Sequence, residues 1–68
     1  MDFALARKRL GMTQAQVAEK LGIDQSTVAG WEQGRWKPAV QSLPRVAAFY
    51  GVTVDELLNG KDNNQNET

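Results

Sequence analysis

The side chains with the most informative chemistry lie in residues 25–33, which read QSTVAGWEQ. Helical spacing places Val28 and Trp31 on one face of this segment and small or neutral polar residues on the opposite face. Those outward residues are Gln25, Ser26, Ala29, Gly30 and Gln33. Amide and hydroxyl groups donate and accept hydrogen bonds without carrying charge, which is the chemistry that recognises the edges of base pairs. The segment therefore has the composition of a helix that reads bases.

A plainer interpretation of the same face is an ordinary solvent-exposed helix surface. Such surfaces usually carry Lys and Glu, and this one carries neither. A glycine inside a helix costs about 1 kcal/mol relative to alanine, so Gly30 needs a reason. Close approach of the helix backbone to the floor of a DNA major groove, which is about 12 Å wide, is the reason that we expect.

Other kinds of chemistry are poorly supported by the composition. The chain has no cysteine and no histidine, which removes the thiolate nucleophile, the commonest general base and the commonest metal ligand. We therefore expect no catalytic site, no metal, no cofactor and no small-molecule substrate, and we do not expect an enzyme. No apolar run is long enough to span a bilayer and no signal peptide is visible, so a cytoplasmic, nucleoid-associated protein is expected.

Charge is unevenly distributed along a chain of 68 residues whose formal net charge is zero. Residues 1–48 contain seven basic residues, namely Arg7, Lys8, Arg9, Lys20, Arg35, Lys37 and Arg45. The acidic residues of the same stretch are Asp2, Glu19, Asp24 and Glu32, whereas residues 49–68 are predominantly acidic. A neutral total can thus conceal a basic surface for nucleic acid, although solvated surface charge is the alternative.

The elements that would position these side chains are five short helices, because apolar residues recur at helical spacing and no alternation of period two is present. Five helical stretches each end at a glycine, as a left-handed helix stop requires: Gly11, Gly22, Gly34, Gly51 and Gly60. The predicted starts are Asp2 before Phe3–Leu10, a capping box of Thr13 and Gln16, Asp24, Ser42 with Pro44 in the first turn, and a second box of Thr53 and Glu56. The fourth helix is expected to run to about Tyr50 with an apolar set of Val40, Leu43, Val46, Ala47 and Tyr50.

The second and third helices match a helix-turn-helix in the stretch QAQVAEKLGIDQSTVAGWEQG. Val17 and Leu21 lie one turn apart, and Val28 and Trp31 would face them from the third helix. Three further residues complete the match: the small Ala18, the turn residue Gly22 and the corner residue Ile23.

The chain resembles the phage repressor and Cro-type helix-turn-helix family, also called the XRE family. The likeness is carried by GMTQAQVAEKLGIDQSTVAGWEQGRWKP and LPRVAAFYGVTVDELLNG and extends over residues 3–60. It implies an all-α, compact five-helix lambda-repressor-like domain over residues 1–60, with the helix-turn-helix in helices two and three. Residues 61–68, KDNNQNET, are predicted to be a disordered polar tail.

The resemblance implies roles for individual residues. Gln25 corresponds to a family position that contacts bases, and a glutamine can pair bidentately with adenine. Gly30 departs from many relatives, which often carry a longer polar side chain there, so we expect this position to meet DNA shape or a thymine methyl, or to make no contact. Arg7 and Glu32 are expected to form an ion pair that leaves Arg7 N–H groups for the DNA backbone. The predicted phosphate contacts are Arg7, Thr13, Gln14, Thr27, Arg35 and Lys37.

The two tryptophans are expected to differ in role. Trp31 faces inward and is predicted to lie in the core. Trp36 follows the Gly34 stop in the basic segment GRWKP. Packing over the fourth helix against Val40, contact with the sugar–phosphate backbone and a place in a dimer contact all remain open for it.

The function that these features favour is sequence-specific binding of duplex DNA by a transcriptional regulator, most simply a repressor. By resemblance, it would act as a homodimer on a palindromic operator, with a dimer surface near Gly51, Val52 and Leu58, where the acidic Glu56 departs from some relatives. The alternative is a protein-interaction module in which the same fold binds a protein partner, for example as an antitoxin does.

Overall fold

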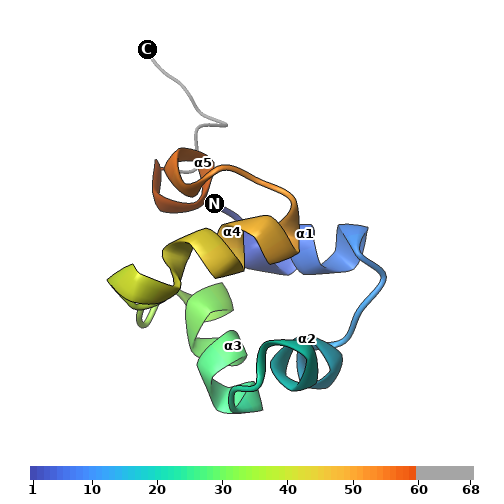
Figure 1. Ribbon diagram of the computed structural model, residues 1–68. Helices are drawn as coiled ribbons and strands as arrows, with labels where there is room; N and C mark the ends of the chain where they lie inside the picture. The colour runs from blue at the N-terminus through green and yellow to red at the C-terminus, as the bar shows by residue number, and fades with distance from the viewer. Residues whose placement is uncertain (60–68) are drawn as a thin grey trace. The chain divides into compact units, whose positions relative to one another are not determined.

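The computed structural model describes residues 1–59, and in that range all regular secondary structure is helical, with no strand (Figure 1). The elements are α1 (Phe3–Arg9), α2 (Gln14–Leu21), α3 (Gln25–Gln33), the short 3₁₀ turn η1 (Val40–Ser42), α4 (Leu43–Tyr50) and α5 (Val54–Asn59). The prediction of an all-α protein with five helices is confirmed. The predicted stop at Gly60 and the predicted tail lie outside the described residues.

The described residues divide into two compact units. One comprises Asp2–Pro38 and carries α1, α2 and α3; the other begins at Ala39 and carries η1, α4 and α5. No helix in residues 1–59 combines the length and the apolar character that crossing a membrane requires.

Side-chain hydrogen bonds cap the N-termini of α1 and α2 in the first unit. The Asp2 carboxylate accepts a hydrogen bond from the Leu5 N–H at 2.9 Å. The Thr13 hydroxyl accepts from the Gln16 N–H at 3.1 Å, and the Gln16 side-chain oxygen accepts from the Thr13 N–H at 2.8 Å. The predicted caps at Asp2 and at the Thr13 box are therefore confirmed. The prediction for Asp24 is wrong in one respect, since it occupies the N-cap position but its side chain makes no capping bond.

The starts of the second unit follow the same logic with one exception. Thr53 and Glu56 form the predicted capping box, with bonds of 3.0 and 2.9 Å. Ser42 makes no side-chain cap, because the η1 turn leads directly into α4 and already holds Ser42 in a helical conformation. Val40 belongs to that turn and is 80% exposed, so its predicted place in the apolar set is wrong.

The core of the first unit forms where α2 and α3 pack together. Val17 of α2 and Val28 of α3 are completely buried, and Ala18 and Leu21 beside them are 4% exposed. Trp31 is 7% exposed and its ring centroid lies 5.6 Å from that of Phe3 in α1. The predicted inward positions, including Trp31, are confirmed.

The second unit has its own buried residues. On α4 these are Leu43, Val46, Ala47 and Tyr50, and on α5 Leu57 is buried. The two helices pack together. α4 ends at Tyr50, as predicted, before Gly51.

Candidate nucleic-acid interface

The geometry of a helix-turn-helix is built by the three residues between α2 and α3. α2 ends at Leu21 and α3 begins at Gln25, and Gly22 makes the reversal possible by adopting a φ of 71°. The Ile23 N–H then donates to the Ala18 carbonyl at 2.9 Å, which closes the end of α2. Because α2 packs on α3 and Val28 and Trp31 of α3 are buried, the opposite side of α3 is fixed as an outward face.

The exposed side of α3 carries the expected polar residues at its start and its end. Gln25, Ser26 and Gln33 are exposed, and Ala29 is partly exposed. Gln25, Ala29 and Gln33 are spaced by four residues, so they lie in one row along the helix. Gln25 and Ser26 occupy the first turn, which is the part of a recognition helix that contacts base edges in proteins with this motif.

Gly30 does not belong to that outward face. It is buried, and a Cβ at this position would overlap Cε2, Cζ2 and Nε1 of the Trp36 indole. The prediction that Gly30 lies bare so that the backbone can approach DNA is therefore wrong. The glycine is needed because a side chain from the same unit occupies the space beside it. The outward face is narrower than predicted and comprises Gln25, Ser26, Ala29 and Gln33.

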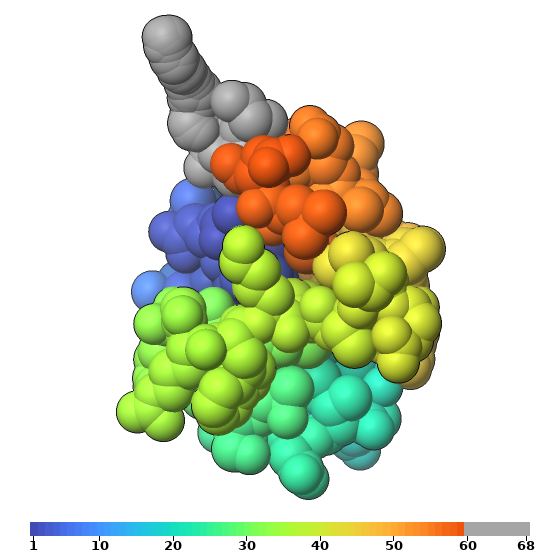
Figure 2. All heavy atoms as spheres, turned by 90° about the vertical axis from the view of Figure 1, so that its left-hand side faces the viewer, coloured from blue at the N-terminus to red at the C-terminus, as the bar shows by residue number. Residues whose placement is uncertain are grey.

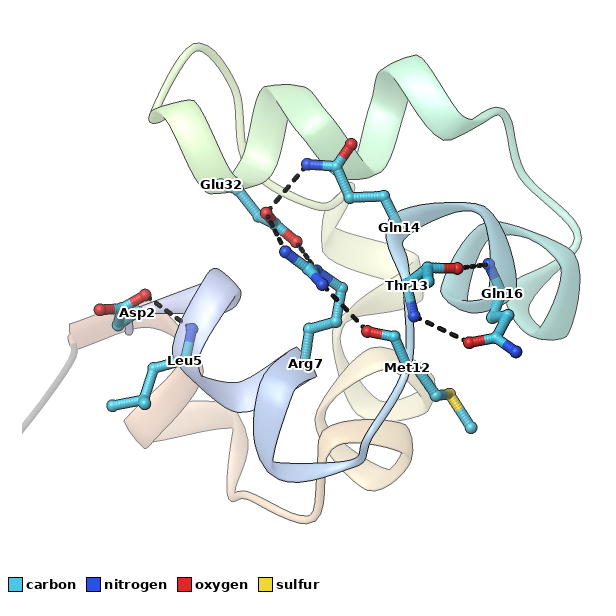
Figure 3. Close-up of polar contacts among 8 residues, drawn as sticks. All are labelled: Asp2, Leu5, Arg7, Met12, Thr13, Gln14, Gln16 and Glu32. Atoms are coloured by element: carbon cyan, nitrogen blue, oxygen red, sulfur yellow. Dashed lines mark hydrogen bonds and ion pairs between the residues drawn. The ribbon is translucent and has the colours of Figure 1, made fainter.

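One carboxylate connects the three helices of this unit (Figure 3). Glu32 of α3 accepts hydrogen bonds from Arg7 of α1, through Nε at 2.6 Å and Nη2 at 3.2 Å. It also accepts from the Gln14 side-chain amide of α2, with 3.0 Å between Nε2 and Oε1. The Arg7 side chain further donates from Nη1 to the Met12 carbonyl at 2.9 Å. The relative positions of α1, α2 and α3 are thus coupled at Glu32.

The electrostatics of this cluster favour the ionised carboxylate. The hydrogen bond from the Arg7 guanidinium holds the pKa of Glu32 below its ordinary value near 4.5. The hydrogen bond from Gln14 and the charges of Arg7 and Lys8 act in the same direction, while burial opposes them. With side chains only 16% and 7% exposed, Arg7 and Glu32 are a largely buried pair rather than a surface ion pair.

The bond from Gln14 was not anticipated from the sequence and bears on its predicted phosphate contact. A glutamine amide has two N–H groups, and Glu32 accepts only one of them. The bond orients the side chain at the start of α2 and leaves the other N–H for a further acceptor. Arg7 uses its Nε, Nη1 and Nη2 on protein acceptors, so it is bound to the protein more completely than expected. Its phosphate contact stays a prediction.

The remaining predicted phosphate contacts lie at the margins of α2 and α3. Thr13 is exposed, and its hydroxyl oxygen caps α2 while the O–H can still donate. Thr27 is partly exposed within α3, and Arg35 and Lys37 are exposed in the segment after it. Residues 1–59 contain no cluster of three or more acidic side chains suited to a metal ion.

A family model for helix-turn-helix proteins, HTH_3, matches residues 3–57 of the chain. The chain belongs to the XRE-type helix-turn-helix family. The match covers both units and includes the turn at Gly22. The resemblance inferred from the sequence is confirmed.

Three relatives illustrate the range of this helix-turn-helix family. The HTH-type transcriptional activator BcrR of Enterococcus faecalis is 39% identical over 51 residues, which cover 75% of this chain and 25% of the relative. The phage CTXphi transcriptional repressor RstR of Vibrio cholerae is 30% identical over 56 residues, 82% of this chain and 50% of the relative. The HTH-type transcriptional regulator ImmR of Bacillus subtilis is 37% identical over 65 residues, 93% of this chain and 50% of the relative.

The helix-turn-helix chain therefore spans a quarter to a half of the length of these relatives. One of them is an activator and another a repressor, so the shared segment does not itself separate the two activities. No solved structure matches the chain significantly.

Proposed function

We propose that this chain binds duplex DNA in a sequence-specific manner by placing the start of α3 in the major groove, and that it regulates transcription. The single observation that supports this most is the outward face of α3, where Gln25, Ser26 and Gln33 are exposed and Ala29 is partly exposed, on a helix whose opposite side is buried. The names of the relatives, all transcriptional regulators, agree with it. Binding to a palindromic operator as a homodimer belongs to the same proposal, and so does repression.

The proposal assigns different tasks to the two ends of the interface. Gln25 reads a base pair, and Ser26 adds a hydroxyl beside it. Phosphates on either side of the groove are held by Gln14, which Glu32 orients, by the exposed Thr13, Arg35 and Lys37, and by the partly exposed Thr27. These contacts fix the register of α3 without reading sequence. The Glu32 cluster keeps α2 and α3 in a constant relation, so that phosphate contacts at α2 position the base contacts of α3.

Substitution of Gln25 by alanine tests the base-reading step. The preferred duplex is first selected from random sequences with the unmodified chain, and single-base variants of that duplex are then compared by titration. Because a bidentate glutamine–adenine pair is worth about 1–3 kcal/mol, Gln25→Ala is expected to lose discrimination at one base pair of each half-site. Gln41→Ala, at an exposed glutamine in η1, is the matched control and should keep the full preference. An unchanged preference in Gln25→Ala would remove Gln25 from the proposal.

Salt dependence separates DNA binding from the protein-interaction alternative. Each phosphate neutralised by a cation adds about 0.9 to the slope of log affinity against log salt, so duplex affinity should fall steeply as salt rises. Arg35→Gln and Lys37→Gln should each reduce that slope, whereas Lys61→Gln, in the acidic segment of the sequence, should not. Failure of the unmodified chain to bind any duplex at low salt would reject the proposal in favour of a protein partner.

A further inference from the structure

The Trp36 indole lies directly against Gly30, at the centre of α3. Any Cβ at position 30 would overlap three atoms of that ring, so only glycine is compatible with this arrangement. An internal glycine destabilises a helix relative to alanine. The close packing of Trp36 explains why a glycine is nevertheless found at position 30. Gly30 is the one glycine in residues 1–59 where an added Cβ would meet another group within contact distance.

The backbone holds the same segment on the same residue. Gly34 ends α3 with a φ of 75°, and its N–H donates to the Trp31 carbonyl at 3.3 Å. The Arg35 N–H donates to the Gly30 carbonyl at 2.9 Å. These two bonds form the paired hydrogen-bond pattern of a left-handed helix end. Gly30 therefore holds residues 34–36 in two ways. Its carbonyl accepts a hydrogen bond from the Arg35 N–H, and the absence of a Cβ leaves room for the Trp36 indole.

Despite this contact, Trp36 remains 48% exposed. It lies between Arg35 and Lys37, which are both exposed, and Figure 2 shows the light-green segment that follows α3 at the surface. A partner that suits this combination offers apolar surface next to negative charge. The sugar–phosphate backbone of DNA offers both, because deoxyribose rings alternate with phosphates.

We propose that Trp36 contacts the sugar–phosphate backbone at the edge of the groove that α3 enters, and that Gly30 is the residue that positions it there. The inference rests on the proposed function. It adds a residue whose side chain reaches DNA from the end of α3, at a fixed distance from Gln25 along one rigid helix. It also gives Gly30 a positioning role in place of a direct contact with bases.

Paired substitutions at the two positions test the inference, with affinity for the selected duplex as the readout. Trp36→Ala is expected to weaken binding by about tenfold, since a truncated tryptophan at an interface commonly has an effect of this size. Gly30→Ala should weaken binding to a similar extent because it displaces the indole. Gly30→Ala introduced into Trp36→Ala should cause no further loss. Leu5→Ala, at a 46% exposed leucine of α1, is the matched control and should bind as the unmodified chain does.

A spectroscopic readout separates contact from a merely structural role. The two indole N–H signals in a proton–nitrogen correlation spectrum are assigned with Trp36→Phe, and the duplex is then added. The Trp36 signal should shift more than that of the buried Trp31. Thermal melting by circular dichroism checks that each variant remains folded.

Three results would overturn the inference. One is duplex affinity in folded Trp36→Ala equal to that of the unmodified chain. Another is a Trp36 signal that stays in place at saturating duplex. The third is a Trp36 signal that moves with protein concentration in the absence of DNA, which would identify a second copy as the partner. If the unmodified chain bound no duplex, the proposed function itself would fail, and that outcome is visible before any variant is made.

Discussion

Glu32→Ala is expected to lower the free energy of unfolding by about 3 kcal/mol, because truncating one partner of a largely buried ion pair removes its charge and its hydrogen bonds together. The carboxylate accepts three hydrogen bonds, two from Arg7 and one from Gln14. In the variant, the Arg7 guanidinium keeps its bond to the Met12 carbonyl but loses its ion pair with Glu32. Because total stability is about 0.05–0.15 kcal/mol per residue, this loss is a large part of what a chain of this size has.

Urea denaturation followed by far-ultraviolet circular dichroism measures the effect. Glu19→Ala is the matched control, since Glu19 is an exposed glutamate on α2, and its removal should change stability by no more than about 0.5 kcal/mol. The loss of stability in Glu32→Gln should lie between those of Glu32→Ala and Glu19→Ala, because the amide keeps the shape of the side chain but lacks its charge. Equal stabilities of Glu32→Ala and Glu19→Ala would show that the cluster does not hold the three helices together.

The same carboxylate gives the stability a defined pH dependence. Its pKa is lower in the folded chain than in the unfolded chain, so its contribution is fully present above the unfolded value near 4.5 and is lost as the pH falls through the folded value. Between about pH 7 and pH 3, the unmodified chain should therefore lose more stability than Glu32→Gln, which has no proton to gain at this position. Parallel pH profiles for the two proteins would contradict the assignment.

Features that depend on a few neighbouring residues were predicted well from the sequence. The capping boxes at Thr13 and Thr53 and the helix end at Gly34 involve residues within five positions of each other. Their geometry is dictated by local hydrogen bonding, so residue type and spacing are sufficient to identify them. The buried positions of α2 and α3 could also be predicted from the sequence, because the spacing of apolar residues along a helix indicates its buried face.

The errors concern contacts whose partner depends on how the chain folds around α3. Gly30 was assigned to an open face because helical spacing cannot show that Trp36, six residues later, turns back over the helix. The bond between Gln14 and Glu32 joins residues 18 positions apart and depends on the packing of α2 against α3. One sequence signal could have predicted the contact between Gly30 and Trp36, namely a glycine inside a helix followed by a tryptophan just beyond the helix end. No comparable sequence signal predicted the hydrogen bond between Gln14 and Glu32.

Trp31→Ala is expected to lower the free energy of unfolding by about 3–5 kcal/mol, at least as much as Glu32→Ala. Trp31 is 7% exposed and packs its ring near that of Phe3, so truncation would open a cavity where α3 meets α1. Trp36→Ala provides the comparison, because it removes an identical side chain that is 48% exposed and should cost about 1 kcal/mol or less.

Chemical denaturation of the two tryptophan variants, with duplex binding measured in parallel, gives opposite patterns if both assignments hold. Trp31→Ala should lose most of its stability, and any loss of binding should follow from unfolding. Trp36→Ala should remain folded and lose affinity. Both residues are tryptophans and lie only five positions apart in one unit. A difference in stability between the two variants therefore reports the difference in burial rather than in side-chain type. Similar stabilities for Trp31→Ala and Trp36→Ala would mean that α3 is not anchored through Trp31, and the outward face of Gln25 would then have no fixed support.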